Sequence, residues 1–295
     1  MFSANKDKLV VVKHNDLIKA AYRLTVLESR IILTCIAQVN SKGKLSADEK
    51  FSVRVEDIAE LIDSGNSRDE MYANLKVALD RLADRWVYFL ERSDNTPMEM
   101  KTRWVSAIGY KPRDASIYLF FAKHIIPFLS ELSSNFTQYK LAHILKFKSS
   151  HTIRFYELFK ASMNSEITLT IEQLKAHLQL EDSYARMDRF QDSVIKPSMA
   201  EINEYTDIKA SYSLVKEGRK ITAFKFIFVC LEDKKSKIKS KPNYSKDRID
   251  GVLKTDLEKY AKPGESYSQA ATRIKAEQLI LEKNGKTTTI DVIWR

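Results

Sequence analysis

The segment from Ser183 to Asn203 carries basic, hydroxyl and amide side chains at the spacing of one helix face. On a helical wheel the apolar residues of this segment gather on one side. The opposite side presents Arg186, Arg189, Ser193, Lys196 and Asn203. Arginine reads the O6 and N7 atoms of guanine in the major groove of double-stranded DNA, and asparagine reads adenine. The spacing therefore predicts a DNA-reading helix. An ordinary solvated helix face is the alternative, and Pro197 argues against a regular helix because it removes a backbone N–H.

Basic residues also gather at the predicted tip of the hairpin that follows this helix. Strands are predicted at Ile208–Val215 and Ile221–Leu231, because large apolar residues alternate along the second of them. The residues between the strands include three cations, Lys216, Arg219 and Lys220. Cations at a hairpin tip can reach the phosphates beside a groove, so this tip is expected to contact DNA.

An earlier helix, which begins after Ser67, offers weaker signals for DNA binding. Lys76 and Arg81 lie on it, but Asp80 and Asp84 also point outward and would repel phosphate. Base readout by this helix and a purely phosphate-contacting or dimer-supporting role remain alternatives.

Other chemistries lack the residues they need. The seven glycines stand at least thirteen positions apart, whereas a nucleotide-binding loop needs several within a few residues. The five histidines are at least eight residues apart, and Cys35 and Cys230 form no metal-binding pair. The tripeptides Asp48-Glu49-Lys50 and Glu232-Asp233-Lys234 match the acidic–x–lysine pattern of nucleases, but nothing identifies the further carboxylate that a metal ion requires. We therefore expect no enzymatic activity, no catalytic residue, no metal site and no cofactor.

Two segments share one apolar template at an offset of 116 residues. In each, alternation at period two passes into spacings of three and four, so a short strand leads into an amphipathic helix. The first copy is Phe51, Val53, Val55, Ile58 and Ile62, and the second is Ile167, Leu169, Ile171, Leu174 and Leu178. A turn, a second helix and a hairpin follow each copy, which is the order of elements in a winged helix-turn-helix.

The predicted fold is therefore α+β: two tandem winged helix-turn-helix domains, plus a basic, partly helical C-terminal extension. Residues 1–145 are expected to form the first domain, for dimerisation and DNA contact. Residues 146–232 form the second, the main DNA reader. Residues 233–295 form a lysine-rich linker and a tail that is helical in pattern from Ile249.

The first domain needs a hairpin after its second helix. The sequence predicts it from a strand at Trp86–Leu90 and an alternating run at Met98–Tyr110. Between the domains, the pattern favours a strand at Ile117–Phe121 and a helix at Lys123–Leu132.

The net charge of +10 is unevenly spread, because residues 233–295 contribute +6 of it. Bulk charge is thus weak support for DNA binding by the two domains. No apolar run approaches the roughly 18 residues of a membrane helix, and the first residues lack a signal-peptide core. The sequence predicts a cytoplasmic protein without membrane contact.

Three motifs point to a known family. The first combines Ser183-Tyr184-Ala185-Arg186-Met187 with Phe190 and Glu201-Ile202-Asn203. The second is Ile153-Arg154-Phe155-Tyr156-Glu157-Leu158-Phe159, and the third combines Lys13-His14-Asn15-Asp16-Leu17 with Leu24-Thr25 and Arg30-Ile31-Ile32-Leu33. Together they resemble iteron-type plasmid replication initiators (the Rep_3 family) over roughly residues 9–232. Within that family the chain closely resembles initiators of small Acinetobacter-type plasmids, including those of related small circular episomes from cattle products.

The resemblance implies that the two winged helices stand in a pseudo-twofold relation. It implies a monomer that binds the direct repeats (iterons) of a plasmid origin, in equilibrium with a homodimer that represses its own promoter at an inverted repeat. It also implies recruitment of the host replication initiator and the replicative helicase in a bacterial cytoplasm, without nucleotide hydrolysis. A tandem winged-helix transcriptional regulator without initiator activity is the alternative.

The resemblance also carries site residues over by position. Ser183, Tyr184, Arg186 and the stretch from Arg189 to Lys196 would contact bases and phosphates. Lys148, Ser149 and Arg154 would hold phosphate near the start of a helix. Family members can carry several consecutive arginines after the phenylalanine, whereas Gln191-Asp192-Ser193 follows here, so the sequence that is read must differ.

Overall fold

The computed structural model of the chain divides into two compact units, Met1–Leu231 and Glu232–Arg295. The structure describes residues 9–59, 67–93, 96–162, 164–218 and 220–231 of the first unit, and 248–249, 252–253, 265–266 and 268–273 of the second. Most of the predicted linker and tail lies outside these residues. Where the tail was expected to become helical, Arg248–Ile249 (β12) pairs antiparallel with Val252–Leu253 (β13). Residues 268–273 are helical.

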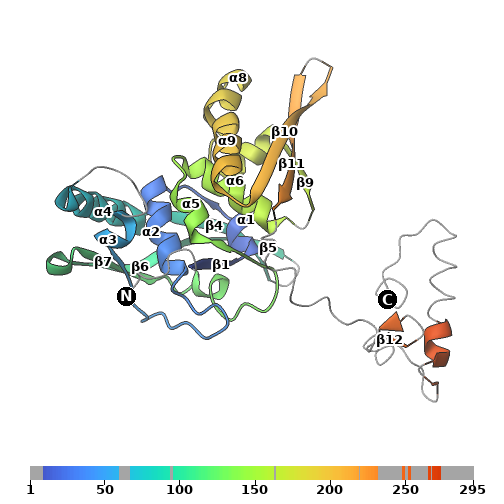
Figure 1. The fold of residues 1–295 in the computed structure, drawn as a ribbon, viewed down its shortest axis with the longest axis horizontal. Coiled ribbons are helices and arrows are strands. Elements are labelled where there is room, and N and C mark those ends of the chain that lie inside the picture. Colours follow the sequence, from blue (N-terminus) through green and yellow to red (C-terminus); the bar gives the residue numbers. More distant parts are fainter. Residues whose placement is uncertain are drawn as a thin grey trace. The chain divides into compact units, whose positions relative to one another are not determined.

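The first winged helix combines a three-stranded sheet with helices whose starts are fixed by local hydrogen bonds (Figure 1). Its helices are α2 (Val26–Ile36), α3 (Val55–Ala59) and α4 (Arg68–Ala83), and its strands are β3 (Phe51–Arg54), β6 (Val105–Lys111) and β7 (Ser116–Phe121). The strand order is β3-β7-β6. Thr25 and Ser67 begin α2 and α4 with capping boxes, in which the hydroxyl accepts from the backbone N–H three residues on.

The second winged helix repeats this arrangement. Its helices are α6 (Ser150–Ala161), α7 (Ile171–Leu178), α8 (Met187–Phe190) and α9 (Lys196–Tyr205), and its strands are β9 (Glu166–Thr170), β10 (Ile208–Glu217) and β11 (Lys220–Cys230). The strand order is β10-β11-β9. Figure 1 shows α8 and α9 standing beside the β10–β11 hairpin, with both projecting from the body of the first unit.

Strand register confirms the repeated unit. In the first sheet Phe51 lies opposite Leu119 and Val53 opposite Ile117, and in the second sheet Ile167 lies opposite Phe226 and Leu169 opposite Phe224. Each template strand is therefore antiparallel to the central strand of its sheet at the same register. Helices α3 and α7 then begin at the matching positions Val55 and Ile171. The two winged helices predicted from the sequence are present.

The hairpin of the first domain differs from the prediction. The run expected as one strand breaks at the buried Trp104 into β5 (Thr96–Arg103) and β6, which belong to different sheets. β5 pairs with β4 (Trp86–Ser93), which pairs in turn with β2 (Ala21–Tyr22). The strand expected between the domains is instead β7, the centre of the first winged-helix sheet. Trp104 fixes this switch, because its carbonyl accepts from Ala122 N while its indole lies in the core.

The helix predicted at Lys123–Leu132 is wrong. That stretch forms turns around a short 3-10 helix at Ile126–Phe128, because Pro127 cannot donate a backbone hydrogen bond. The remaining elements of the first unit are β1 (Val10–His14), α1 (Asn15–Lys19), a 3-10 turn (Pro112–Asp114), β8 (Phe136–Lys140) and α5 (Leu141–Leu145). β1 pairs with β8 antiparallel.

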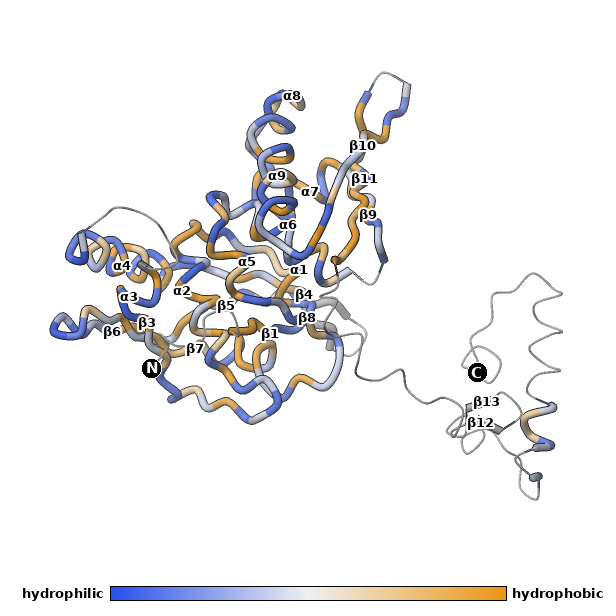
Figure 2. Tube along the Cα trace, viewed as in Figure 1, coloured by the Kyte–Doolittle hydropathy of each residue, from blue (hydrophilic) through white to orange (hydrophobic). Residues whose placement is uncertain are grey.

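One continuous core runs through both winged helices, and it includes Leu79 of α4, Phe155 of α6 and Phe224 of β11. Figure 2 shows the hydrophilic colours gathering at the free ends of α4 and of the β6–β7 hairpin. In the first winged helix, the ends that project from the body are thus the polar ones.

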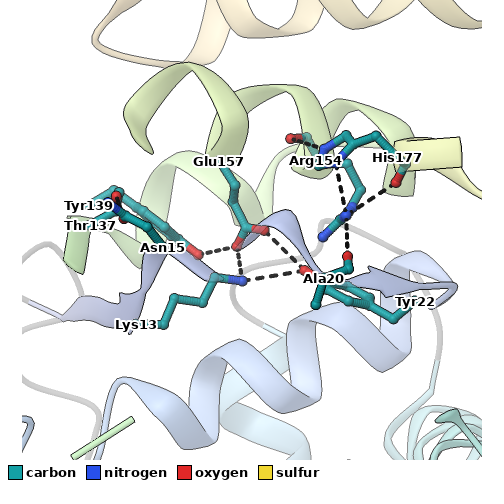
Figure 3. A network of polar contacts seen from close by, with 9 residues as sticks. All are labelled: Lys13, Asn15, Ala20, Tyr22, Thr137, Tyr139, Arg154, Glu157 and His177. Carbon is teal, nitrogen blue, oxygen red and sulfur yellow. Dashed lines mark hydrogen bonds and ion pairs between the residues drawn. The ribbon is translucent and has the colours of Figure 1, made fainter. Parts of the chain in front are cut away.

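A buried polar network joins α6 to strands β1, β2 and β8 (Figure 3). The Glu157 carboxylate lies 2.6 Å from Lys13 Nζ, and each of these two side chains is 1% exposed. Glu157 also accepts hydrogen bonds from the hydroxyls of Tyr22 and Tyr139. Because a buried charge needs partners of this kind, the network fixes α6 against β1, β2 and β8.

Candidate nucleic-acid interface

The predicted reading helix presents the expected faces. Phe190, Val194, Ser198 and Ile202 are buried, whereas Arg186, Arg189, Ser193 and Lys196 are exposed. Tyr184 enters this segment with a left-handed backbone (φ 57°), and its ring packs against Phe190 at 5.6 Å between centroids. The side chains that could read bases therefore face solvent along one edge of α8 and α9.

A π-helical turn at Gln191–Ile195 joins α8 to α9. Proline inside an α-helix lacks a donor and crowds the carbonyl four residues earlier, and a widened turn relieves both problems. Pro197 lies at the start of α9, directly after the widened turn. Ile195 and Met199 are buried as well, so the widened turn broadens the apolar side of the segment.

Two of the exposed cations are paired with acids of the same segment. Arg186 Nε and Nη2 lie 3.1 and 2.5 Å from the two carboxylate oxygens of Asp188. Lys196 Nζ lies 2.6 Å from Asp192 Oδ1. The Arg186 hydrogen bond lowers the pKa of the Asp188 carboxyl to about 2. Within the described part of the chain, Arg189 has no ion pair.

Asp188 was not among the predicted site residues. Asp192 was noted only as a departure from the family pattern. The spacing of four residues between Asp192 and Lys196 was the available signal, since such pairs are neighbours on a helix.

Asn203 does not face outward to read a base, contrary to the prediction. Its Nδ2 donates to Ala210 O at 2.8 Å and its Oδ1 accepts from Ala210 N at 2.7 Å. Both halves of the amide are thus used on strand β10. Asn203 ties the end of α9 to the wing.

The β10–β11 hairpin carries its cations near the tip. Lys216 and Lys220 are exposed, and Gly218 adopts a left-handed backbone (φ 61°) that suits glycine in the turn. Lys216 follows a break in strand register after Val215. Arg219, the third predicted cation, lies outside the described residues.

Arg154 does not face outward to hold phosphate, contrary to the prediction. Its side chain is 6% exposed, and Nη2 donates to the carbonyls of Ala20 at 2.8 Å and His177 at 3.1 Å. Its guanidinium also stacks on the Tyr22 ring at 4.0 Å (Figure 3). These contacts link α6 to α7 and to the first domain, so the side chain is committed to the protein interior rather than to phosphate.

Ser149 and Lys148, the other two residues predicted to hold phosphate near the start of α6, differ in what their side chains do. Ser149 caps α6, because its hydroxyl accepts from His151 N at 3.2 Å. Lys148 uses its backbone N–H on the Glu201 carboxylate, and its side chain remains exposed. Only the lysine side chain is free to reach a phosphate here.

The first winged helix offers a comparable but more constrained surface. Lys76 and Arg81 are exposed on α4, and Lys76 Nζ lies 5.1 Å from the centre of the Tyr110 ring. The Tyr110 hydroxyl donates to Asp80, and burial, followed by that carboxylate, raises its pKa to about 12. Asp80, one of the two acids that were expected to repel phosphate, therefore accepts a hydrogen bond from Tyr110 on β6.

No group of three or more His, Cys, Asp and Glu side chains within the described ranges could hold a metal ion. Among those residues, no helix is long and apolar enough to cross a membrane.

Comparison with known proteins matches both halves of this arrangement. The family model of the initiator replication protein, WH1, matches residues 10–160, and that of the initiator Rep protein, WH2, matches residues 170–228. A replication initiation protein of Escherichia coli is 26% identical over 210 residues, which are 68% of this chain and 64% of the relative, so the chain spans less than two thirds of that relative. The PI protein of Escherichia coli is 26% identical over 267 residues, 79% of this chain and 86% of the relative.

A solved structure shares the fold. The crystal structure of the Pi initiator protein in complex with iteron DNA superimposes with a TM-score of 0.65 at 24% identity, over 77% of this chain and 99% of that one. The two matched models together span the winged helices built from the repeated template. This chain belongs to the family of initiator replication proteins, with the WH1 domain followed by the WH2 domain.

Proposed function

We propose that this protein initiates plasmid replication by binding direct repeats of double-stranded DNA at an origin. The observation that carries the proposal is the match of both initiator models, in chain order, to two winged helices, the second of which presents exposed cations along α8 and α9. A relative with the same fold was crystallised on iteron DNA, which supports double-stranded repeats as the ligand.

In this proposal the second winged helix is the main reader. The α8–α9 segment enters the major groove with Arg189, which has no ion pair within the described residues, and with Arg186, Ser193 and Lys196 along the same edge. Lys148, Lys216 and Lys220 contact phosphates, which fix orientation but carry no sequence information. Tyr184 and Ser183 position the start of the reading segment. In this proposal the first domain comprises residues 1–145, the second domain residues 146–232 and the extension residues 233–295.

The first winged helix has two proposed roles. Lys76 and Arg81 on α4 contact a second stretch of the same repeat. The sheet of this domain also forms a homodimer, in equilibrium with the monomer, that represses the promoter of its own gene at an inverted repeat. The edge strand β6 exposes Ser106, Ala107 and Tyr110, and an edge strand has unpaired backbone groups that a second chain can satisfy.

The initiator would work in the cytoplasm of its bacterial host by opening the origin and recruiting the host initiator and the replicative helicase. The glycine spacing leaves no nucleotide-binding loop, which supports a role without its own nucleotide hydrolysis.

Autonomous replication tests the proposal. A fragment carrying the gene and its upstream repeats, joined to a selectable marker without another origin, should yield stable transformants. The same fragment with Arg189→Ala and Lys196→Ala should not. Promoter repression without replication would identify a transcriptional regulator instead and would contradict the proposal.

A further inference from the structure

The reading segment of the second winged helix is not positively charged overall. Between residues 181 and 200 the chain has four acidic and three basic side chains. Asp188 and Asp192 are each 55% exposed and lie on the same segment as the cations that face DNA in the proposed function. A helix of this composition gains little from the phosphate backbone alone, because nonspecific affinity depends on the number of cations that replace counterions.

The two acids also hold the cations that would otherwise contact any phosphate. Asp188 binds Arg186 through both carboxylate oxygens, and Asp192 binds Lys196. Arg186 and Lys196 must leave these partners before they bind DNA. Each exchange leaves a carboxylate close to a polyanion, which is unfavourable unless a base donor faces it.

Base pairs can supply that donor. The N4 amino group of cytosine and the N6 amino group of adenine point into the major groove, and carboxylates accept from the former in protein–DNA complexes. A repeat that places an amino group opposite each acid compensates both charges, and a random sequence does not. The same acids then favour the correct repeat and oppose all others.

We propose that Asp188 and Asp192 are specificity-determining residues that suppress binding to DNA other than the cognate repeat. This inference rests on the proposed function, since it assumes that α8 and α9 face DNA. In the free protein the Arg186 hydrogen bond lowers the pKa of the Asp188 carboxyl to about 2, so this acid is ionised when the protein meets DNA.

The test compares two duplexes for each variant. One duplex is selected from a random-sequence library by the wild-type protein, and the other is a shuffled version of the same composition. Asp188→Asn and Asp192→Asn should strengthen binding to the shuffled duplex about threefold to tenfold and steepen its salt dependence by up to about one unit of slope. Binding to the selected duplex should change by less than about twofold or weaken, so the ratio of the two affinities falls.

Asp48→Asn is the matched control, because it makes the same change in net charge at an exposed position of the first domain. It should leave the affinity ratio unchanged. Equal strengthening on both duplexes by Asp188→Asn and Asp192→Asn would overturn the inference, since the acids would then act only through net charge. A wild-type protein that selects no duplex would instead overturn the proposed function itself. Both acids are exposed, so thermal unfolding should match the wild type and confirm that the variants fold.

Discussion

At the scale of single residues, the sequence predicts correctly whether a side chain faces solvent when neighbouring residues of the same helix determine it. Arg189, Ser193 and Lys196 face solvent because the apolar stripe on the other side of their helix fixes its rotation. Arg154 was misplaced because its partners, Ala20 O and His177 O, come from distant parts of the chain. Nothing in the residues around Arg154 signals them.

Arg189→Ala should weaken binding to the selected duplex by about 1–3 kcal/mol, as expected for a base-directed arginine. Arg189 has no ion pair within the described residues, so its removal leaves no unpaired acid in the free protein. Titration against selected and shuffled duplexes measures the effect. An equal loss on both duplexes would make Arg189 a phosphate contact.

Glu157→Gln should lower the free energy of unfolding by about 3–5 kcal/mol, because it leaves the buried ammonium of Lys13 without its countercharge. Glu49→Gln, at an exposed position, should change it by less than about 0.5 kcal/mol. Denaturation in urea measures both variants. Similar stability of Glu157→Gln and wild type would show that the pair does not hold α6 in place.

At the scale of elements, the sequence predicted the repeated strand–helix template but not the division of strands between sheets. The template is local, and the capping hydroxyls of Ser67 and Thr170 mark helix starts directly. The residues before Trp104 pair with β4, which precedes them in the sequence, and the residues after Trp104 pair with β7, which follows them. Alternation predicts a strand but does not choose its partner.

Replacing Lys216 and Lys220 by alanine should reduce the slope of log K against log salt by about 2, at roughly 0.9 per phosphate contact. The preference between selected and shuffled duplexes should stay the same, because wing contacts to phosphate carry no sequence information. Lys42→Ala with Lys44→Ala, two exposed lysines of the first domain, is the control and should leave the slope unchanged. An unchanged slope for the wing variant would place the wing away from DNA.

His177 on α7 should make stability depend on pH. Burial, followed by the charge of Arg154, holds the pKa of its imidazole well below the usual value. Below about pH 6.5 the unfolded chain binds a proton at this group and the folded chain does not, so the free energy of unfolding falls as the pH drops from 7 to 5. Denaturation at several pH values measures the slope, which should be smaller in His177→Gln. Equal slopes for the two proteins would exclude this origin.

At the scale of the whole molecule, the fold class and the two winged helices followed from the sequence, whereas the dimer surface expected in the first domain stays a prediction. Trp104, the large apolar residue between β5 and β6, is 1% exposed and belongs to the core, so it is not available to a partner chain. The exposed residues of that sheet lie mainly on the edge strand β6. A pattern of large apolar residues does not distinguish a core from an interface.

Ala107→Lys, on the exposed edge of β6, should shift the proposed dimer toward monomer and weaken promoter repression more than replication. Charged side chains on an edge strand oppose pairing with another chain. Sedimentation velocity over a hundredfold range of concentration measures the equilibrium, with wild type and Lys44→Ala as references. A wild-type protein that stays monomeric throughout, or a dimer unaffected by Ala107→Lys, would move the interface elsewhere or remove it.

The central claim is that the chain recognises repeated double-stranded DNA through its second winged helix. Footprinting over the DNA upstream of its own gene tests this most directly. The account predicts regularly spaced protected stretches, each over the same sequence in the same orientation, that disappear with Arg189→Ala and Lys196→Ala. Protection that is absent, or uniform along the fragment and unaffected by these substitutions, would contradict it.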